Sequence, residues 1–348
     1  MCIRDRRRPV RERYDPSAAH DWTTDMDLDD LRPLAGSSGR FLTILLPAPS
    51  HHADAAERFA IERKTALKFV SADWPADDLQ ALDHELAELP HDAGAGLIVV
   101  RSTAGDSLVE FIDDPVEPAV FEGSSPRLAP LIESRQRTIA HVVVEADLAG
   151  ADLTAFDGGD VLATGVVEGE TEYIHRGHPG GWSQRRFQQR AENTWEENAD
   201  DVAHAARRLA DRVGARLIAV AGPDRARTMV VKSLADAPMA VVSLSAGNPD
   251  GIAEEVTRHT ADIAAADTVD VIRRARESMA TTEGFVGDVL DAVVAGRVET
   301  LIVHDDGARG DDRYIDRCIR AALTTGASIH VVPKVGALRD GAGAVLRW

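Results

Sequence analysis

The sequence has few of the residues that build disulfide frameworks, thiolate metal sites or membrane spans. Its 348 residues include two cysteines, Cys2 and Cys318, and no apolar run approaches the roughly 20 residues that cross a bilayer. Two cysteines far apart exclude a disulfide framework and fit a reducing compartment. The first residues are basic and lack the apolar stretch of a signal peptide. We therefore expect a cytoplasmic protein without a membrane segment.

The chain also lacks the charge that would attract it to nucleic acid as a whole. Its formal net charge is −19 at pH 7, so the summed field repels polyanions such as RNA and anionic membranes. Any contact with RNA must come from a local group of cations.

Motifs of several enzyme classes are missing as well. The sequence contains no metalloprotease, zinc-finger or EF-hand spacing, no GxxxxGK[ST] phosphate loop and no GxSxG nucleophile turn. We expect neither a metal nor a cofactor. The polar residues His304 to Asp306 follow an apolar run, where we expect solvated side chains at a strand end. Cys318 lies in a helical pattern and is expected to be a small core residue.

Length and composition predict several domains in an α/β multidomain chain. We expect a disordered basic arm over residues 1–30, an N-terminal α/β domain over 31–135, a central domain over 136–268 and a C-terminal α/β/α domain over 269–348. On its run of arginines alone, the arm is alternatively a tail that binds nucleic acid.

In the N-terminal domain, short apolar runs predict strands at 41–49, 96–102 and 107–112, with helices at about 52–70 and 79–89. Residues 115–130, rich in Pro, Ser and Gly, predict an irregular closing segment. The C-terminal domain alternates helix and strand from about residue 270, with helices at 288–298 and 313–326 and strands at 300–306, 328–333 and 341–348. Such alternation is typical of an α/β/α sandwich.

The central domain opens with three strand-like runs, 139–147, 151–159 and 160–169, which predict an antiparallel meander. A long helix follows, with one apolar stripe that ends before Gly214, a predicted helix stop. The stripe consists of Trp195, Ala199, Val202, Ala206, Leu209 and Val213. Strands at 216–223 and 239–244 then alternate with helices from about 224 and 251, which adds parallel strands and predicts a ribonuclease-H-like mixed sheet.

The segment HRGHPGGWSQRRFQQR, residues 175–190, differs from the rest of this acidic chain. No Asp or Glu lies between Glu172 and Glu192. Adjacent glycines permit positive φ and close approach to another molecule, arginine pairs with phosphate, and tryptophan stacks on unpaired bases. Arginines at the start of a helix are disfavoured by its dipole, so a polyanionic partner supplies a reason for them. The candidate RNA-binding residues are His175, Arg176, His178, Gly180, Gly181, Trp182, Arg185, Arg186 and Arg190.

A structural interpretation of the same segment stays open. The indole would fold back onto the sheet, and the arginines would pair with Glu192, Glu196 and Glu197, because ion pairs between helical neighbours are common. A third interpretation is a loop that binds an acidic protein instead of RNA.

The three-domain order, the meander with a Gly-Gly loop running into a long helix, and the terminal GAGAVLRW resemble the eukaryotic and archaeal class-1 peptide chain release factor superfamily, which includes Pelota. The resemblance covers about residues 30–348 and is strongest to the bacterial branch, which includes Balon-like ribosome hibernation factors. In that family the central domain carries a Gly-Gly-Gln tip that enters the peptidyl transferase centre, and the last domain resembles a kink-turn-binding ribosomal protein.

Two departures from the family bear on function. Gly180 and Gly181 match the tip, but Trp182 replaces the glutamine that helps to coordinate the hydrolytic water, and an indole has one donor and no acceptor. Gln184 is the candidate substitute. The family's Asn-Ile-Lys-Ser codon-reading motif is absent, because the first asparagine is Asn193.

The resemblance therefore implies a ribosome-binding factor that occupies the aminoacyl site near the peptidyl transferase centre and inhibits or protects idle ribosomes under stress. It does not imply codon-dependent termination. By family analogy, elongation factor Tu is a delivery partner. The alternative is a peptidyl-tRNA hydrolase that rescues stalled ribosomes with Gln184 as the catalytic residue.

Overall fold

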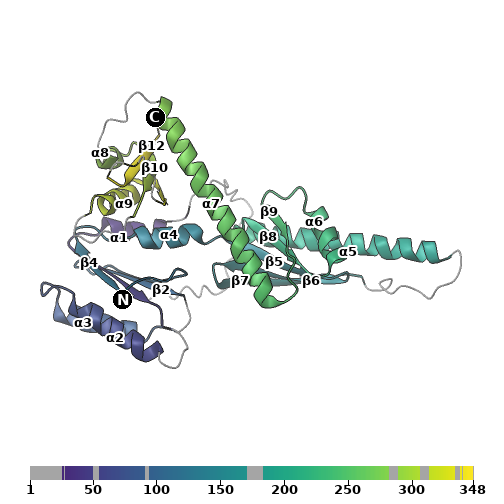
Figure 1. Cartoon of the computed structure of the whole chain (residues 1–348), viewed down its shortest axis with the longest axis horizontal. Helices are drawn as coiled ribbons and strands as arrows, with labels where there is room; N and C mark the ends of the chain where they lie inside the picture. The colour runs from purple at the N-terminus through teal and green to yellow at the C-terminus, as the bar shows by residue number, and fades with distance from the viewer. Residues whose placement is uncertain are drawn as a thin grey trace. The chain divides into compact units, whose positions relative to one another are not determined.

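The computed structural model describes residues 26, 28–49, 55–90, 94–170, 183–281, 289–305, 313–333, 338 and 340–347, without the side chains of 183–190 and 278–281. The chain divides into two compact units. The central unit is residues 137–266, and the terminal unit combines residues 1–136 with residues 267–348. The fold is the predicted multidomain α/β fold (Figure 1). The predicted N-terminal domain (31–135) and the predicted C-terminal domain (269–348) therefore lie in one unit.

The central unit is built on a five-stranded mixed sheet of order β7-β6-β5-β8-β9. Strands β5 (His141–Ala146), β6 (Gly150–Asp157) and β7 (Asp160–Glu168) form the predicted antiparallel meander. Strands β8 (Leu217–Ala221) and β9 (Ala240–Ser243) add to β5 in parallel, in the ribonuclease-H-like plan expected from the sequence.

Helices cover both faces of this sheet. Helix α5 (Ser183–Val213) and helix α6 (Asp224–Ser233) pack on one face, and the start of α7 (Pro249–Thr281) packs on the other. The predicted stripe of α5 is buried on the sheet except Val213, which is partly buried. Gly214 takes φ 67°, as its role as a helix stop requires.

The terminal unit contains two sheets. Strands β1 (Phe41–Pro47), β2 (Gly96–Ser102), β3 (Ser107–Ile112) and β4 (Ala119–Gly123) form an antiparallel sheet of order β3-β2-β1-β4. Strands β10 (Val298–Val303), β11 (Ser328–Val331) and β12 (Ala342–Leu346) form the second, in order β11-β10-β12. Strand β11 is parallel and β12 antiparallel to β10.

The helices of the terminal unit join its two sheets. Helices α2 (Ala55–Lys68) and α3 (Ala76–Ala87) cover one face of the first sheet. On the other face, α1 (Arg32–Gly36, after a 3-10 turn at Asp29–Leu31) and α4 (Ala129–Arg137) share a core with α8 (Val289–Val294), α9 (Tyr314–Thr325) and the second sheet. Cys318 of α9 is fully buried in this core, as predicted.

The expectation of an irregular segment at 115–130 is wrong. Strand β4 lies within it and pairs with β1 from Phe41↔Gly123 to Leu45↔Ala119. Pro118 precedes this strand, and proline next to a strand at a sheet edge removes no ladder hydrogen bond. The turn residues were correctly recognised, but they flank a short strand.

Helix α7 is longer than the sequence pattern indicated. It runs unbroken through the predicted start of the C-terminal domain near residue 270, because no Gly or Pro occurs between Ile252 and Thr281. Its first half belongs to the central unit and its second half to the terminal unit. In the described chain, no helix has the length and apolarity that a bilayer crossing requires.

A buried charge cluster connects the two sheets of the terminal unit. Arg127, between β4 and α4, lies 3.7 Å from the Asp316 carboxylate of α9, and both are at most 5% exposed. Arg313 lies 4.0 Å from the same carboxylate and pairs with Asp305 at 2.7 Å. The expectation that His304 to Asp306 are solvated is therefore wrong for Asp305, whose side chain is 11% exposed. Asp306 lies outside the described residues.

Burial raises the pKa of Asp316 to about 6, although Arg313 and Arg127 favour the charged carboxylate. The folded state therefore binds this proton more tightly than the unfolded chain, whose aspartate pKa is about 3.9. As pH falls from 7 through 6 towards 4, the contribution of Asp316 should increase the free energy of unfolding, by at most about 1.4 kcal/mol for each step of one in pH. Urea unfolding at pH 5 and pH 7 measures this change in the free energy of unfolding.

The matched variant is Asp316→Asn, which has no proton to bind. It should lose the part of the pH dependence that wild type shows between pH 4 and 6, whatever its stability at a single pH. Equal slopes in the two proteins would contradict a raised pKa for Asp316.

Candidate nucleic-acid interface

The predicted RNA-binding segment falls at the start of α5. Six of its candidate residues lie outside the described residues: His175, Arg176, His178, Gly180, Gly181 and Trp182. The other three, and Gln184, belong to the first turns of the helix: Arg185, Arg186 and Arg190. In this helix Arg186 and Arg190 are one turn apart. No acidic residue occupies the first turn, so the positive end of the helix dipole is left without the usual counter-charge there.

Helix α5 supports this segment as a long rod. Its 31 residues span about 46 Å, and its buried side chains from Ala199 to Ala210 pack against the sheet. Figure 1 shows α5 extending past the strands of its own sheet. The packed part fixes the helix direction, so the arginine-bearing turns are held in one orientation relative to the central sheet.

The other end of the segment is anchored by Asn198, which is 4% exposed in α5. Its side-chain amide donates to the carbonyl oxygens of Leu148 (2.9 Å) and Glu170 (3.1 Å), and its oxygen accepts from the Glu170 N–H at 2.9 Å. A Cβ at Gly169 would lie 2.4 Å from this amide, so only glycine fits beside it. Residue 170, where the described chain stops, is thereby tied to α5.

The glutamates that were candidate partners of the arginines are partly engaged elsewhere. Glu192 pairs with Arg225 of α6 at 3.1 Å, and the Arg225 guanidinium lies 4.2 Å from the centre of the Trp195 ring. Glu196 and Glu197 form no ion pair among the residues that the structure describes. The side chains of the neighbouring arginines lie outside the description, so the interpretation that these glutamates neutralise them stays a prediction.

A second cationic surface, missed by sequence reasoning, lies on α2. Between residues 28 and 136, six arginines have carboxylate partners: Arg32, Arg40, Arg63, Arg101, Arg127 and Arg135. Arg58, Lys64 and Lys68 have none among the described residues, and all three belong to α2. Phe69 and Ile61, 75% and 58% exposed, lie beside them.

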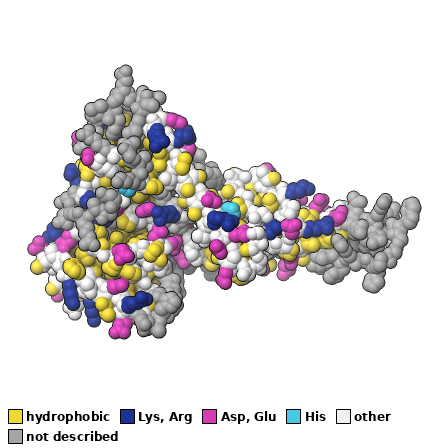
Figure 2. All heavy atoms as spheres, viewed as in Figure 1, with side chains coloured by type: hydrophobic (Ala, Val, Ile, Leu, Met, Phe, Trp, Pro, Cys, Tyr) yellow, Lys and Arg dark blue, Asp and Glu magenta, His cyan; other side chains and the backbone are white. Residues whose placement is uncertain are grey.

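We call this set the α2 surface. Cations next to an exposed aromatic ring suit a nucleic-acid backbone with a stacked base. The signal in the sequence is weak, because Arg63, which is paired and buried, stands next to Lys64 and the pattern of charges does not separate them. On the face drawn in Figure 2, basic and acidic side chains are interspersed over the described surface. Local cation groups therefore matter more than the overall field.

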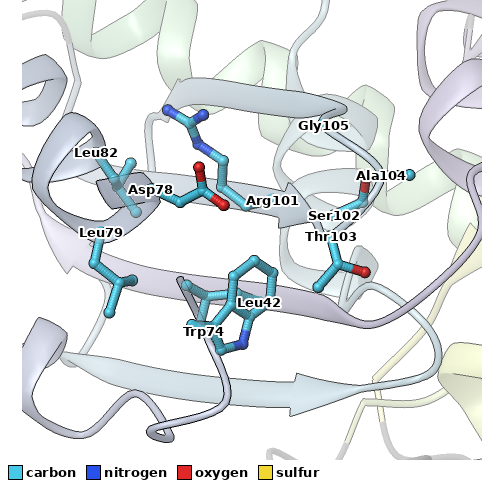
Figure 3. Close-up of a pocket in the computed structure, with 10 residues that line it drawn as sticks. All are labelled: Leu42, Trp74, Asp78, Leu79, Leu82, Arg101, Ser102, Thr103, Ala104 and Gly105. Carbon is cyan, nitrogen blue, oxygen red and sulfur yellow. The ribbon is translucent and has the colours of Figure 1, made fainter. Parts of the chain in front are cut away.

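The first sheet also carries a pocket of about 250 Å³ between α3 and the β2–β3 turn (Figure 3). Its polar side chains are largely used by the fold. Arg101 pairs with Glu85, and the Trp74 indole donates to Glu122 at 3.0 Å. The pocket contains no histidine or cysteine beside its serine and threonine, so it offers no activated nucleophile. Among the described residues, no His, Cys, Asp and Glu side chains gather into a metal-ligand set.

Comparison with known proteins finds a family model that matches part of the chain. Residues 140–281 match the model of bacterial archaeo-eukaryotic release factor family 2. Two proteins of Mycobacterium tuberculosis, named Uncharacterized protein MT2704 (strain CDC 1551 / Oshkosh) and Uncharacterized protein Rv2629 (strain ATCC 25618 / H37Rv), are each 24% identical over 368 residues, covering 93% of this chain and 97% of theirs.

Solved structures of release-factor-like proteins also align. Archaeal termination factor aRF1 is 18% identical with a TM-score of 0.24, covering 91% of this chain and 96% of its own. Archaeal Pelota, from a model of ribosome-bound Pelota and ABCE1, is 18% identical with a TM-score of 0.42, covering 94% and 95%. S. cerevisiae Dom34 is 10% identical with a TM-score of 0.36, covering 88% and 89%. At these TM-scores no argument about function follows from them.

The mixed sheet with its long helix lies in the part of the chain that matches a release-factor family model. The family whose model matches residues 140–281 is bacterial archaeo-eukaryotic release factor family 2, in agreement with the predicted resemblance to the bacterial branch. The match contains the whole segment 171–190.

The anchoring of the loop can be tested at Asn198. Replacement by alanine removes part-buried hydrogen bonds to backbone groups of Leu148 and Glu170, each worth about 0.5–1.5 kcal/mol. We expect Asn198→Ala to lower the urea midpoint and to speed amide exchange at Glu170. Exposed Asn193→Ala, five residues earlier in the same helix, is the matched control and should change neither. Equal effects of the two substitutions would show that Asn198 does not anchor the loop.

Proposed function

We propose that this protein is a ribosome-associated translation factor of the cytoplasm that occupies the aminoacyl site and presents residues 175–190 to the RNA of the peptidyl transferase centre. There it inhibits or protects idle ribosomes under stress, without codon-dependent termination. The observation that carries this proposal is the carboxylate-free, arginine-rich segment at the start of α5, in the region that matches a release-factor family.

The physical argument starts from the net charge. A chain with a formal net charge of −19 has no general attraction to RNA, so binding depends on cations concentrated where a contact is made. Arginines 185, 186 and 190 would neutralise phosphates, Arg176 would add to them, and His175 or His178 would contribute hydrogen bonds. Trp182 would stack on a base, and Gly180 and Gly181 would permit close approach.

The support from the fold is mechanical. The segment is held between Asn198 at one end and the packed part of α5 at the other, which reduces the entropy lost when it binds. The α2 surface supplies a second group of unpaired cations with an exposed phenylalanine, suited to another RNA contact. Elongation factor Tu is proposed as the delivery partner by family analogy alone.

Charge reversal at the start of α5 tests the contact. Arg185→Glu with Arg186→Glu should abolish sedimentation of the protein with ribosomes at low salt, because like charges then meet the RNA phosphates. The control is Arg208→Glu with Arg212→Glu, the same charge change at the opposite end of the same helix, on residues without a described ion pair.

We expect the control to pellet like wild type and both variants to keep the wild-type circular dichroism spectrum. If both variants lose binding equally, only net charge matters, and the segment is not the contact. A wild-type protein that never pellets with ribosomes overturns the proposal and favours a loop that binds an acidic protein.

The second candidate is a peptidyl-tRNA hydrolase with Gln184 as the water-positioning residue. Gln184 is the second residue of α5, so its backbone is fixed in a helix directly after the Gly-Gly segment. Ribosomes that carry labelled peptidyl-tRNA separate the two functions. We expect no peptide release by wild type. Release by wild type that disappears in Gln184→Ala, with ribosome binding unchanged, would show the hydrolase instead.

A further inference from the structure

Strand β7 ends the central sheet, so one side of its backbone has no strand partner among the described residues. Its register with β6 shows which groups face that side. The N–H of Gly169, just after β7, donates to Ala149 on the β6 side at 2.6 Å. Because backbone groups alternate along a strand, the N–H and C=O groups of Thr164, Val166 and Glu168 point to the open side.

Strand β7 carries exposed apolar side chains, and its register with β6 places Val161 and Val166 on the face of the sheet that bears Phe156. Val161, Leu162 and Val166 are 58%, 38% and 69% exposed, and they are three of the seven large exposed hydrophobic residues in the described chain. Helix α7 covers the other half of this face of the sheet, over Val143, Ala219 and Ala221. A row of free backbone groups beside exposed valines is the usual template for an added strand.

Strand β7 also lacks the features that normally prevent such pairing. Proteins protect edge strands with lysine, proline or irregular geometry, and the sequence DVLATGVVE contains neither lysine nor proline. Its one irregularity is a bulge near its start, where Leu162 is an extra residue between Val161, opposite Phe156, and Ala163, opposite Ala155. The section from Ala163 to Glu168 is regular.

The charges around β7 identify the kind of partner. Acidic residues stand at both ends of the strand and on its neighbour: Asp152, Asp157, Asp160, Glu168 and Glu170. An RNA strand is repelled by this set. A second copy of β7, paired antiparallel about Thr164, would place its own Asp160 opposite Glu168, which is also unfavourable.

We propose that β7 binds an extended protein segment that adds to the sheet as a sixth strand, with alternating apolar side chains and with Lys or Arg at both ends. Backbone hydrogen bonds to Thr164, Val166 and Glu168 hold it in register, and its basic ends meet the acidic ends of β7. This surface is separate from residues 175–190, and its test needs no ribosome.

The test uses a labelled synthetic peptide in which valine and threonine alternate between two pairs of lysines, and a control peptide with glutamates in place of the lysines. Fluorescence anisotropy measures affinity, and amide hydrogen exchange measures where the peptide binds. We expect the lysine peptide to bind and to slow exchange at Thr164, Val166 and Glu168. Residues 163, 165 and 167 should change little, because their N–H groups already face β6. The glutamate peptide should bind at least about tenfold more weakly.

Variants at Val166 distinguish strand pairing from nonspecific hydrophobic binding. Val166→Pro removes an outward N–H, and Val166→Lys adds a positive charge that repels the lysines of the peptide. Each substitution should weaken binding of the lysine peptide by about tenfold or more. Val166→Thr keeps the donor and the branched shape and should bind within about twofold of wild type. The urea midpoint of each variant checks the fold, and Val166→Lys keeps the test valid if the proline variant is unstable.

The proposal is overturned if the lysine peptide does not bind or if both peptides bind equally well. It is also overturned if folded Val166→Pro or Val166→Lys binds the lysine peptide like wild type. Slowed amide exchange that is not confined to Thr164, Val166 and Glu168 would count against it in the same way. Dimerisation of wild type that Val166→Lys removes would assign the surface to a second copy instead.

Discussion

The packing of α5 against the central sheet is the constraint on which the candidate interface depends. Small side chains at Ala199, Ala203, Ala206 and Ala210, all buried, let the helix approach β5 and β6 closely. The same helix therefore serves two purposes. Its packed part contributes to the core, and its first turns contain the arginines of the candidate interface. A shift in the packing would move the arginine-bearing turns as a rigid body.

Much of this arrangement was predictable from the sequence. The strands of the meander, the stripe of α5 and the stop at Gly214 follow from local periodicity and from the special backbone freedom of glycine. The candidate site was predicted from an absence, since a stretch without carboxylates in an acidic chain is visible by counting. Such signals are local, and they survive without knowledge of the fold.

What the sequence did not reveal depends on residues far apart along the chain. Arg127 and Asp316 meet only because the first and last sheets share a core, and so Asp305, held by Arg313, is enclosed instead of solvated. The α2 surface became visible only when the other arginines were matched to carboxylates on distant elements. Strand β4 was predicted as an irregular segment because prolines and glycine surround it, and composition alone does not distinguish a short edge strand from a loop.

The central unit thus combines surfaces of opposite character. The start of α5 concentrates cations, whereas the outer side of β7 is apolar with acidic ends. In a chain with a net charge of −19, acidic surroundings weaken random attraction to RNA, so that phosphates would be attracted only where cations are concentrated, as at the arginine-rich segment and the α2 surface. The same acidity that limits RNA contacts favours basic protein segments at β7. If both proposals hold, one charge distribution directs different classes of partner to different parts of one sheet-and-helix unit.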